Sequence, residues 1–158
     1  MMLTILAATL LTPPPPEGDD RTAILYSVHR FAEAVSNPAG SDMQAVLDPQ
    51  VNVTIVDMRD PAGPDRILVI DRAAFFARLA KATEPVRERV GIPTVHQRGS
   101  LAQVWVPYSV WIGEKRSHCG IDNFTLARRD QEWVITAVSY SLEPVANCAA
   151  LAAPESPE

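Results

Sequence analysis

Residues 101–142 read LAQVWVPYSVWIGEKRSHCGIDNFTLARRDQEWVITAVSYSL, and this stretch decides the fold. β-Branched and aromatic residues, which favour strands, fill three runs at 101–112, 118–127 and 133–142. Short polar segments separate the runs, and connections of that length join antiparallel neighbours. The stretch therefore predicts three consecutive antiparallel strands, with turns centred on Glu114-Lys115 and near Arg129-Asp130.

Helical patterns precede these strands. Acidic residues at 19 and 20 favour a helix start, and apolar residues then recur every three or four positions. The apolar stripe consists of Ile24, Val28, Phe31 and Val35. The segment SNPAG at 36–40 ends this helix, and a second, short helix is expected from Ser41 to Asp48.

The middle of the chain predicts further strands and one more helix. Two β-branched runs, at 51–58 and 67–70, flank a proline-rich loop and are typical of strands. Asp71 fits the N-cap of a third helix that ends near Glu84, and residues 86–97 indicate another, interrupted strand. Helices collected on one side of an antiparallel sheet define an α+β architecture.

Length and charge narrow the class of protein. A chain of 158 residues with 47% hydrophobic content is enough for a single domain, which we place at 19–146. The net charge is -5 and no basic stripe is present, so the sequence does not predict a nucleic-acid-binding protein. Ala, Pro and Glu dominate residues 147–158, and this composition predicts a disordered tail.

The first 18 residues resemble an export signal followed by a spacer. Met1–Leu11 is almost wholly apolar and too short to span a bilayer, which fits a signal peptide. The proline run at 13–16 forms a stiff spacer. The expected location is therefore periplasmic or secreted, with no stable membrane insertion after export. A frayed N-terminus or a misassigned start codon is the alternative.

The chain has two cysteines, and an exported protein would allow them to pair. Cys119 lies in the middle strand of the three, and Cys148 follows the last one. A disulfide between them would close a long loop and stabilise the fold. The alternative is a buried free Cys119 with Cys148 in the tail.

Alternation along the three strands sorts their side chains onto two faces. With the turns centred as above, one face mixes bulky aromatic, polar and small residues, whereas the other is almost uniformly apolar. The members of the mixed face include Trp105, Trp111, His118, Asp122, Phe124 and Ser139. Both faces of the sheet must then be buried against another layer of structure, and the helices can bury only one of them. We therefore expect a homodimer through the sheet, although a one-residue slip in either turn would exchange the faces.

The mixed face predicts a ligand pocket. Small-molecule sites are usually lined by aromatic and apolar residues with a few placed polar groups. The expected lining consists of Trp105, Trp111, His118, Asp122, Phe124 and Ser139. Alternatively, His118 and Asp122 are polar residues whose hydrogen bonds are satisfied within the core.

The remaining polar patterns are less specific. Asp57 and Arg59 end a strand beside the proline-rich loop, where they would line the rim of a pocket or simply pair with each other at the surface. Three scattered histidines without matching carboxylate spacing do not predict a metal site. No phosphate loop, dinucleotide fingerprint or nucleophile elbow is present, so no cofactor is expected.

Four segments resemble the nuclear transport factor 2-like superfamily, in particular its SnoaL-like or lumazine-binding bacterial members. They are 28–31 in the first helix, LAQVWVPY at 101–108, SHCGIDNFTL at 117–126 and WVI at 133–135. The resemblance runs from about Asp20 to Glu143. It implies a curved sheet wrapped around the N-terminal helices as a cone. It says little about activity, because one fold hosts many functions.

A comparison with the ketosteroid isomerases of this superfamily shows whether the sequence has the residues for one such activity. They use a tyrosine of the first helix as an oxyanion donor and an aspartate near the end of the first strand as a base. By the resemblance, the tyrosine position falls on Phe31, which cannot donate a hydrogen bond, and the base would be Asp57 or Asp60. Isomerase chemistry of that kind is therefore not predicted.

Three hypotheses for function follow. The first is an exported, non-catalytic domain that binds an apolar or aromatic small molecule in the cone. The second is an isomerase, dehydratase or hydrolase with Asp122 or Asp57 as acid/base and His118 or Tyr108 as its partner. The third is a dimeric interaction module whose cone is filled by its own side chains.

Overall fold

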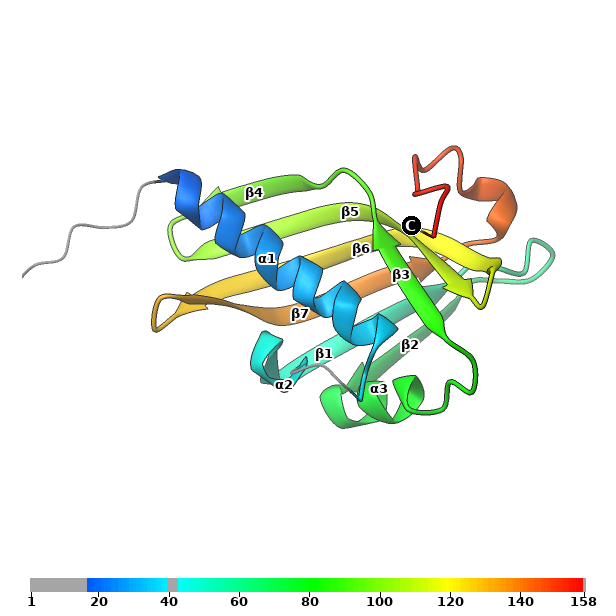
Figure 1. Cartoon of the computed structure of the whole chain (residues 1–158), viewed down its shortest axis with the longest axis horizontal. Coiled ribbons are helices and arrows are strands. Elements are labelled where there is room, and N and C mark those ends of the chain that lie inside the picture. Colours follow the sequence, from blue (N-terminus) through cyan, green and yellow to red (C-terminus); the bar gives the residue numbers. More distant parts are fainter. Residues whose placement is uncertain (1–16, 40–42, 158) are drawn as a thin grey trace, which may run out of the picture.

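A single curved sheet wraps around one long helix in the computed structural model, which describes residues 17–39 and 43–157 (Figure 1). The strand order is β2-β1-β7-β6-β5-β3, and β4 pairs with β5 next to β3. The helices are α1 (Glu17–Ser36), α2 (Met43–Val46) and α3 (Arg72–Leu79), with a short 3-10 helix η1 (Val145–Asn147). The strands are β1 (Leu47–Asp57), β2 (Arg66–Asp71), β3 (Val86–Val90), β4 (Thr94–Arg98), β5 (Leu101–Ile112), β6 (Lys115–Arg129) and β7 (Glu132–Leu142).

The α+β class, the element order and the C-terminal meander are confirmed. The one departure in pairing is that β1 lies parallel to β7, whereas the other neighbours are antiparallel. The expected signal peptide and spacer fall almost entirely on residues 1–16, which lie outside the described residues. None of the described helices is long and apolar enough to cross a membrane.

The turn between β5 and β6 differs from the sequence prediction by one residue. Ile112 pairs with Lys115, so the turn is formed by Gly113 and Glu114, and Gly113 supplies the positive φ of 60° that glycine tolerates best. A bulge between Val110 and Trp111 then shifts the register. As a result His118 lies opposite Val110 rather than Trp111, and β5 presents its other face to the helix.

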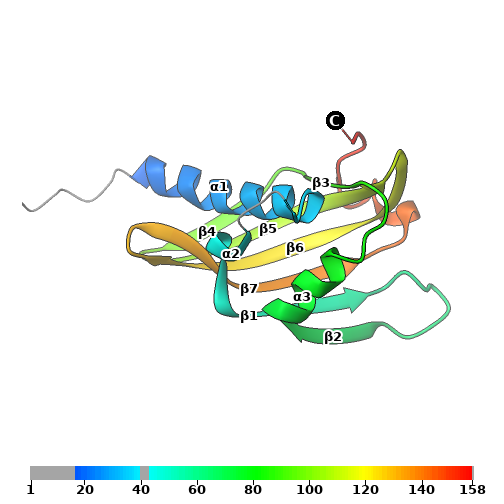
Figure 2. The ribbon, with the colours of Figure 1, turned by 60° about the horizontal axis from the view of Figure 1, so that its bottom comes forward.

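The concave face of the sheet buries α1 along its length (Figure 2). The apolar stripe expected from the sequence is buried there: Ile24, Val28, Phe31 and Val35 are all at most 8% exposed. Phe31 packs edge-on against Phe124 of β6, with ring centres 5.0 Å apart, and stacks on Phe75 of α3 at 5.8 Å. Helix and sheet are therefore joined by one aromatic cluster.

The C-terminal segment packs on the convex face of β5 and β6, so the prediction of a disordered tail is wrong for residues 148–157. Cys119 and Cys148 form a disulfide with a sequence separation of 29. Beyond it, the Pro154 carbonyl accepts hydrogen bonds from Ser109 at 2.8 Å and from Arg116. Composition alone could not reveal these anchors, because the partners lie far upstream in the sequence.

This segment also changes the argument for a dimer. It covers part of the convex face within one chain, so that face does not require a second copy throughout. Trp105 on the same face is still 51% exposed. A homodimer through the sheet stays a prediction.

Removal of the disulfide tests how firmly the C-terminal segment is held. In the chain-entropy model, a closed loop of this length stabilises a fold by about 3 kcal/mol. We expect the Cys119→Ala, Cys148→Ala variant to lose free energy of unfolding of that order in urea denaturation. The wild-type chain under reducing conditions should lose a similar amount, and a loss below about 1 kcal/mol in both would contradict the assignment.

Candidate functional site

A cavity of about 920 Å³ opens between the C-terminal half of α1, α3 and the strands β3, β5, β6 and β7. Its apolar walls include Phe31, Val35, Phe75, Phe76, Leu79, Val86, Val110, Ile112 and Leu142. The strands contribute five polar side chains, Glu88, Tyr108, His118, Asp122 and Tyr140, and the helices and neighbouring loops contribute others, among them Ser36, Gln44, Arg78, Lys81 and Glu84. This volume lies at the upper end of the range typical of small-molecule sites, and apolar walls with few polar groups are their usual composition.

Asp122 is the most deeply buried charged residue of the cavity. It lies on β6 between Val106 of β5 and Tyr140 of β7, which are its direct neighbours across the sheet. Its side chain is 2% exposed, and its Oδ2 has no hydrogen-bond partner among the described residues. Burial without a partner disfavours the carboxylate and raises the pKa of Asp122 well above its ordinary value.

Glu88 brings a second carboxyl into the same cavity. It lies on β3 opposite Val110, is 7% exposed, and leaves Oε1 without a hydrogen-bond partner in the described structure. Its backbone amide donates to the Ser36 hydroxyl at the end of α1, which fixes β3 against the helix. Burial raises the pKa of Glu88 well above its usual range, and the charge of Asp122 adds to this effect.

Sequence reasoning missed Glu88, although a signal exists. In the segment VRERV at 86–90, Val86, Glu88 and Val90 alternate with two arginines. A carboxyl at the apolar position of an alternating strand is unusual enough to mark a site. The arginines Arg87 and Arg89 instead donate to carbonyls of Gly113 and Pro157.

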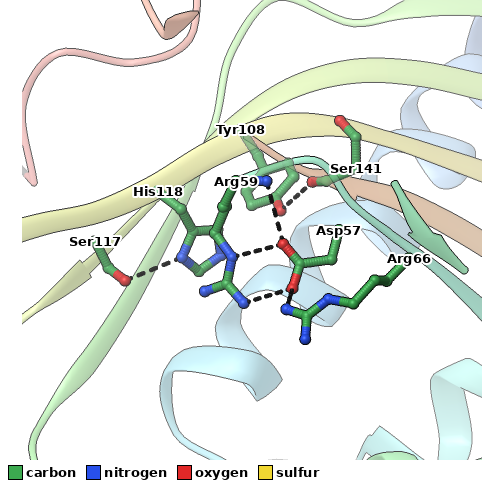
Figure 3. A network of polar contacts seen from close by, with 7 residues as sticks. All are labelled: Asp57, Arg59, Arg66, Tyr108, Ser117, His118 and Ser141. Atoms are coloured by element: carbon green, nitrogen blue, oxygen red, sulfur yellow. Dashed lines mark hydrogen bonds and ion pairs between the residues drawn. The ribbon is translucent and has the colours of Figure 1, made fainter. Parts of the chain in front are cut away.

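Tyr108 and His118 are neighbours on the cavity wall, with ring centres 5.9 Å apart in an edge-to-face arrangement. The Tyr108 hydroxyl donates to the Ser141 carbonyl at 2.6 Å, so its only proton is already used (Figure 3). His118 Nδ1 lies 3.1 Å from the Ser117 hydroxyl. Burial, followed by the nearby Arg59 guanidinium, lowers the pKa of His118 to about 4, so this imidazole is neutral at physiological pH.

Gly120 makes the hydrogen bond of Tyr108 possible. It lies opposite Tyr108 in the sheet. A Cβ at this position would lie 2.8 Å from the Ser141 carbonyl carbon and closer still to its oxygen. Only glycine therefore leaves room for the Ser141 carbonyl to turn toward the Tyr108 hydroxyl.

Asp57 and Arg59 pair with each other beside His118 (Figure 3). This pairing was one of the two expectations for these residues from the sequence. Arg59 binds both oxygens of Asp57 at 2.8 Å, and Arg66 adds a third contact at the same distance. These arginines hold the pKa of Asp57 far below its ordinary value. Asp57 is thus a fixed anion whose oxygens are occupied, and it does not suit the role of a base.

Two register shifts remove three of the expected pocket residues from the cavity: the bulge after Val110 turns Trp105 and Trp111 of β5 outward, and a bulge at Thr136 does the same for Ser139 of β7. Trp105 pairs with Asn123 on the convex face, Ser139 accepts a hydrogen bond from Asn123 there, and Trp111 is buried beneath the Arg116 guanidinium. Phe124 lies on the concave face but belongs to the aromatic cluster around Phe31. His118 and Asp122 do line the cavity. The expectation that they lie on one face with Trp105 and Trp111 is wrong, because the bulge between Val110 and Trp111 turns the other face of β5 toward the helix.

Metal ligands are absent from this arrangement as far as the structure describes it. Over residues 17–39 and 43–157, no three His, Cys, Asp or Glu side chains come together as a metal-binding group.

Gly120→Ala tests the close approach of Ser141. The added methyl group must displace the Ser141 backbone, and overpacking of this kind typically costs about 1–3 kcal/mol. Tyr108→Phe is the matched variant: it keeps the ring but removes the hydroxyl, and should cost about 1 kcal/mol. Urea denaturation measures both, and an alanine variant with wild-type stability would contradict the geometry.

The lowered pKa of His118 predicts a pH-dependent stability. The unfolded chain takes up a proton near 6.5, whereas folded His118 resists protonation down to about 4. The folded state therefore loses free energy of unfolding as the pH falls through this window, by about 2–3 kcal/mol for this residue. His118→Gln should remove that part of the pH dependence in urea denaturation. Parallel stability curves for the two proteins between these values would refute the buried, neutral imidazole.

No protein-family model matches the sequence, and no curated protein does. Solved structures do match. A nuclear transport factor 2-like protein of unknown function from Shewanella baltica is 14% identical, with 83% of this chain and 99% of that chain covered at a TM-score of 0.65. A nuclear transport factor 2-like protein with a cystatin-like fold from Novosphingobium aromaticivorans is 15% identical, with coverages of 85% and 87% and a TM-score of 0.64.

A third similar structure is described by a role. It is the beta subunit of a putative aromatic-ring-hydroxylating dioxygenase from Novosphingobium aromaticivorans, and it is 12% identical. The match covers 81% of this chain and 92% of that chain, with a TM-score of 0.65. At such identities the structural similarity supports a shared fold but not a shared activity. The chain has the cystatin-like fold of the nuclear transport factor 2-like proteins, as the resemblance of its sequence implied.

Proposed function

We propose that this protein binds a small, largely apolar molecule inside its cone. The observation that carries the proposal is the cavity of about 920 Å³, whose apolar walls come from both helices and strands. The buried and half-buried polar groups of the strands are gathered on β3, β5, β6 and β7, whereas the exposed ones come from the helices and neighbouring loops. Such a distribution favours a ligand with an apolar body and one polar end.

The alternative of a filled cone is not supported, because a cavity of about 920 Å³ lies between the helices and the sheet. Ketosteroid isomerase chemistry is also not supported, since Phe31 packs between Phe75 and Phe124 and offers no hydrogen-bond donor. The Tyr108 proton is used by Ser141, which leaves it unsuited to polarise a ligand carbonyl.

A second candidate function is acid–base catalysis by Asp122. One observation favours it: a carboxyl with a raised pKa, unpartnered and beside an apolar cavity, is the state that general acids require. Asp57 and Tyr108 are not candidates for acid–base catalysis, because both form other interactions. His118 would then be the neutral neighbour within the same cavity. Binding remains the first proposal, since it needs only the cavity.

The location proposed with this function is an oxidising compartment outside the cytoplasm. The disulfide between Cys119 and Cys148 supports it, because structural disulfides form and persist in such compartments. The same disulfide attaches the C-terminal segment to β6.

A neutral, environment-sensitive probe tests the proposed binding. N-phenylnaphthylamine should fluoresce in the presence of the full chain, and Leu142→Trp should abolish the signal because it fills the cavity wall. Ala137→Trp is the control, since this exposed residue lies on the convex face of the same strand. Both variants should keep the wild-type circular dichroism. No fluorescence change with the wild-type chain, or equal signals from both variants, would disprove binding in the cone.

A further inference from the structure

We propose that the polar end of the ligand is a cation: the cavity takes a protonated amine with an apolar or aromatic body, and its nitrogen binds between Glu88 and Asp122. This inference rests on the proposed function, because it names the ligand class of the same cavity. The carboxyls come from two strands, β3 and β6, and both line the one cavity. Each is more than nine-tenths buried.

The first argument is that the two carboxyls have no partner of their own. Neither Glu88 nor Asp122 forms an ion pair or accepts a side-chain hydrogen bond from any residue that the structure describes, and Glu88 Oε1 and Asp122 Oδ2 are buried without one. Buried polar groups are nearly always satisfied, and the exceptions often mark functional sites. A cationic ligand would supply the missing donors to both side chains at once.

The second argument is that the cations near the cavity are engaged elsewhere or lie at its mouth. Arg59 is held by both oxygens of Asp57. Arg87, next to Glu88 in the chain, donates to the Gly113 carbonyl. Arg78 and Lys81 line the cavity but are exposed and form no ion pair with either buried carboxyl. Within the described chain, the charge opposite Glu88 and Asp122 is therefore missing.

The third argument comes from the aromatic rings around Asp122. Tyr140 lies directly across from Asp122, and its ring stands perpendicular to that of Tyr108, with centres 6.4 Å apart. Electron-rich ring faces beside a carboxyl attract organic cations. The Tyr140 hydroxyl has no hydrogen-bond partner among the described residues, so it can contact the ligand as well. His118 does not oppose a cation, because its pKa is lowered to about 4.

A neutral ligand is the competing case, and pH separates the two. A protonated carboxyl would donate to a ligand carbonyl, and binding would weaken as the pH rises and the proton leaves. An ammonium group instead prefers the carboxylates, so binding releases protons and strengthens with pH. The other cavity groups are Tyr108 and Tyr140, whose pKa values burial raises, neutral His118, and at the mouth Arg78, Lys81 and Glu84. Arg59 and Asp57 beside His118 stay paired.

A matched set of probes tests the inference on the full chain. Naphthylmethylamine is a cation, naphthylmethanol is its neutral isostere and naphthoate is an anion. By titration calorimetry at about pH 8, we expect the amine to bind at least tenfold tighter than the alcohol, and naphthoate to bind more weakly than both. The amine's affinity should rise with pH as the two carboxyls lose their protons, and its binding heat should reveal proton release through its dependence on the buffer.

Carboxyl-to-amide variants test whether Glu88 and Asp122 bind the nitrogen of the amine. Glu88→Gln and Asp122→Asn should each lower the amine's affinity toward that of the alcohol and leave the alcohol's affinity within about threefold of wild type. Glu132→Gln is the control, because Glu132 is an exposed carboxyl that does not line the cavity. Alcohol binding by each variant shows that it is folded.

The outcomes distinguish this inference from the function on which it rests. If the alcohol binds wild type as tightly as the amine, or the amine's affinity falls as the pH rises, the ligand is not a cation and the proposed function stands. If the amine's preference survives in the Glu88→Gln, Asp122→Asn double variant, the nitrogen binds elsewhere and the inference is overturned. If none of the probes binds, the proposed function and this inference fail together.

Discussion

Two carboxyl groups, Glu88 and Asp122, are buried in one apolar cavity without a counter-charge from the described chain, and the rest of the site is arranged around this constraint. Burial disfavours their ionisation, so both pKa values are raised. The contribution of these two groups to stability is then greatest where both are protonated, and it is lost as the pH rises through their folded-state pKa values. A fold that retains such a pair accepts a less stable native state at neutral pH, which is common at functional sites.

Glu88 and Asp122 can line a cavity because the helices cover only part of the concave face of the sheet. The aromatic cluster of Phe31, Phe75 and Phe124 joins α1 and α3 to the sheet. Beside it the sheet continues without helix over it, and β3 crosses obliquely in front of the other strands (Figure 1). Ser36 at the end of α1 holds the Glu88 amide, and Gly120 allows Ser141 to hold Tyr108. Hydrogen bonds between side-chain hydroxyls and the backbone therefore help to position the cavity walls.

The element pattern was predictable from the sequence, because alternation and helical periodicity are local properties. The faces of β5 were not, since they depend on the bulge after Val110, which shifts the pairing with β6 by one residue. A one-residue difference moved Trp105 and Trp111 out of the expected pocket and left His118 and Asp122 inside it. Glu88 could have been noticed in the sequence, because it occupies a position where the alternation of the strand calls for an apolar residue. Its proximity to Asp122 could not, since it depends on the curvature of the sheet. The anchors of the C-terminal segment are likewise contacts between distant residues.

The central claim is that Asp122 lies inside the cone as an unpartnered, buried carboxyl. Carbon-13 NMR of its side-chain carboxyl, titrated in the full chain and assigned with Asp122→Asn, measures this directly. The structure predicts that the Asp122 carboxyl titrates well above the ordinary value of 3.8. A titration at or below that value would show a solvated or paired carboxylate, and would contradict both the buried pair and the cavity built around it.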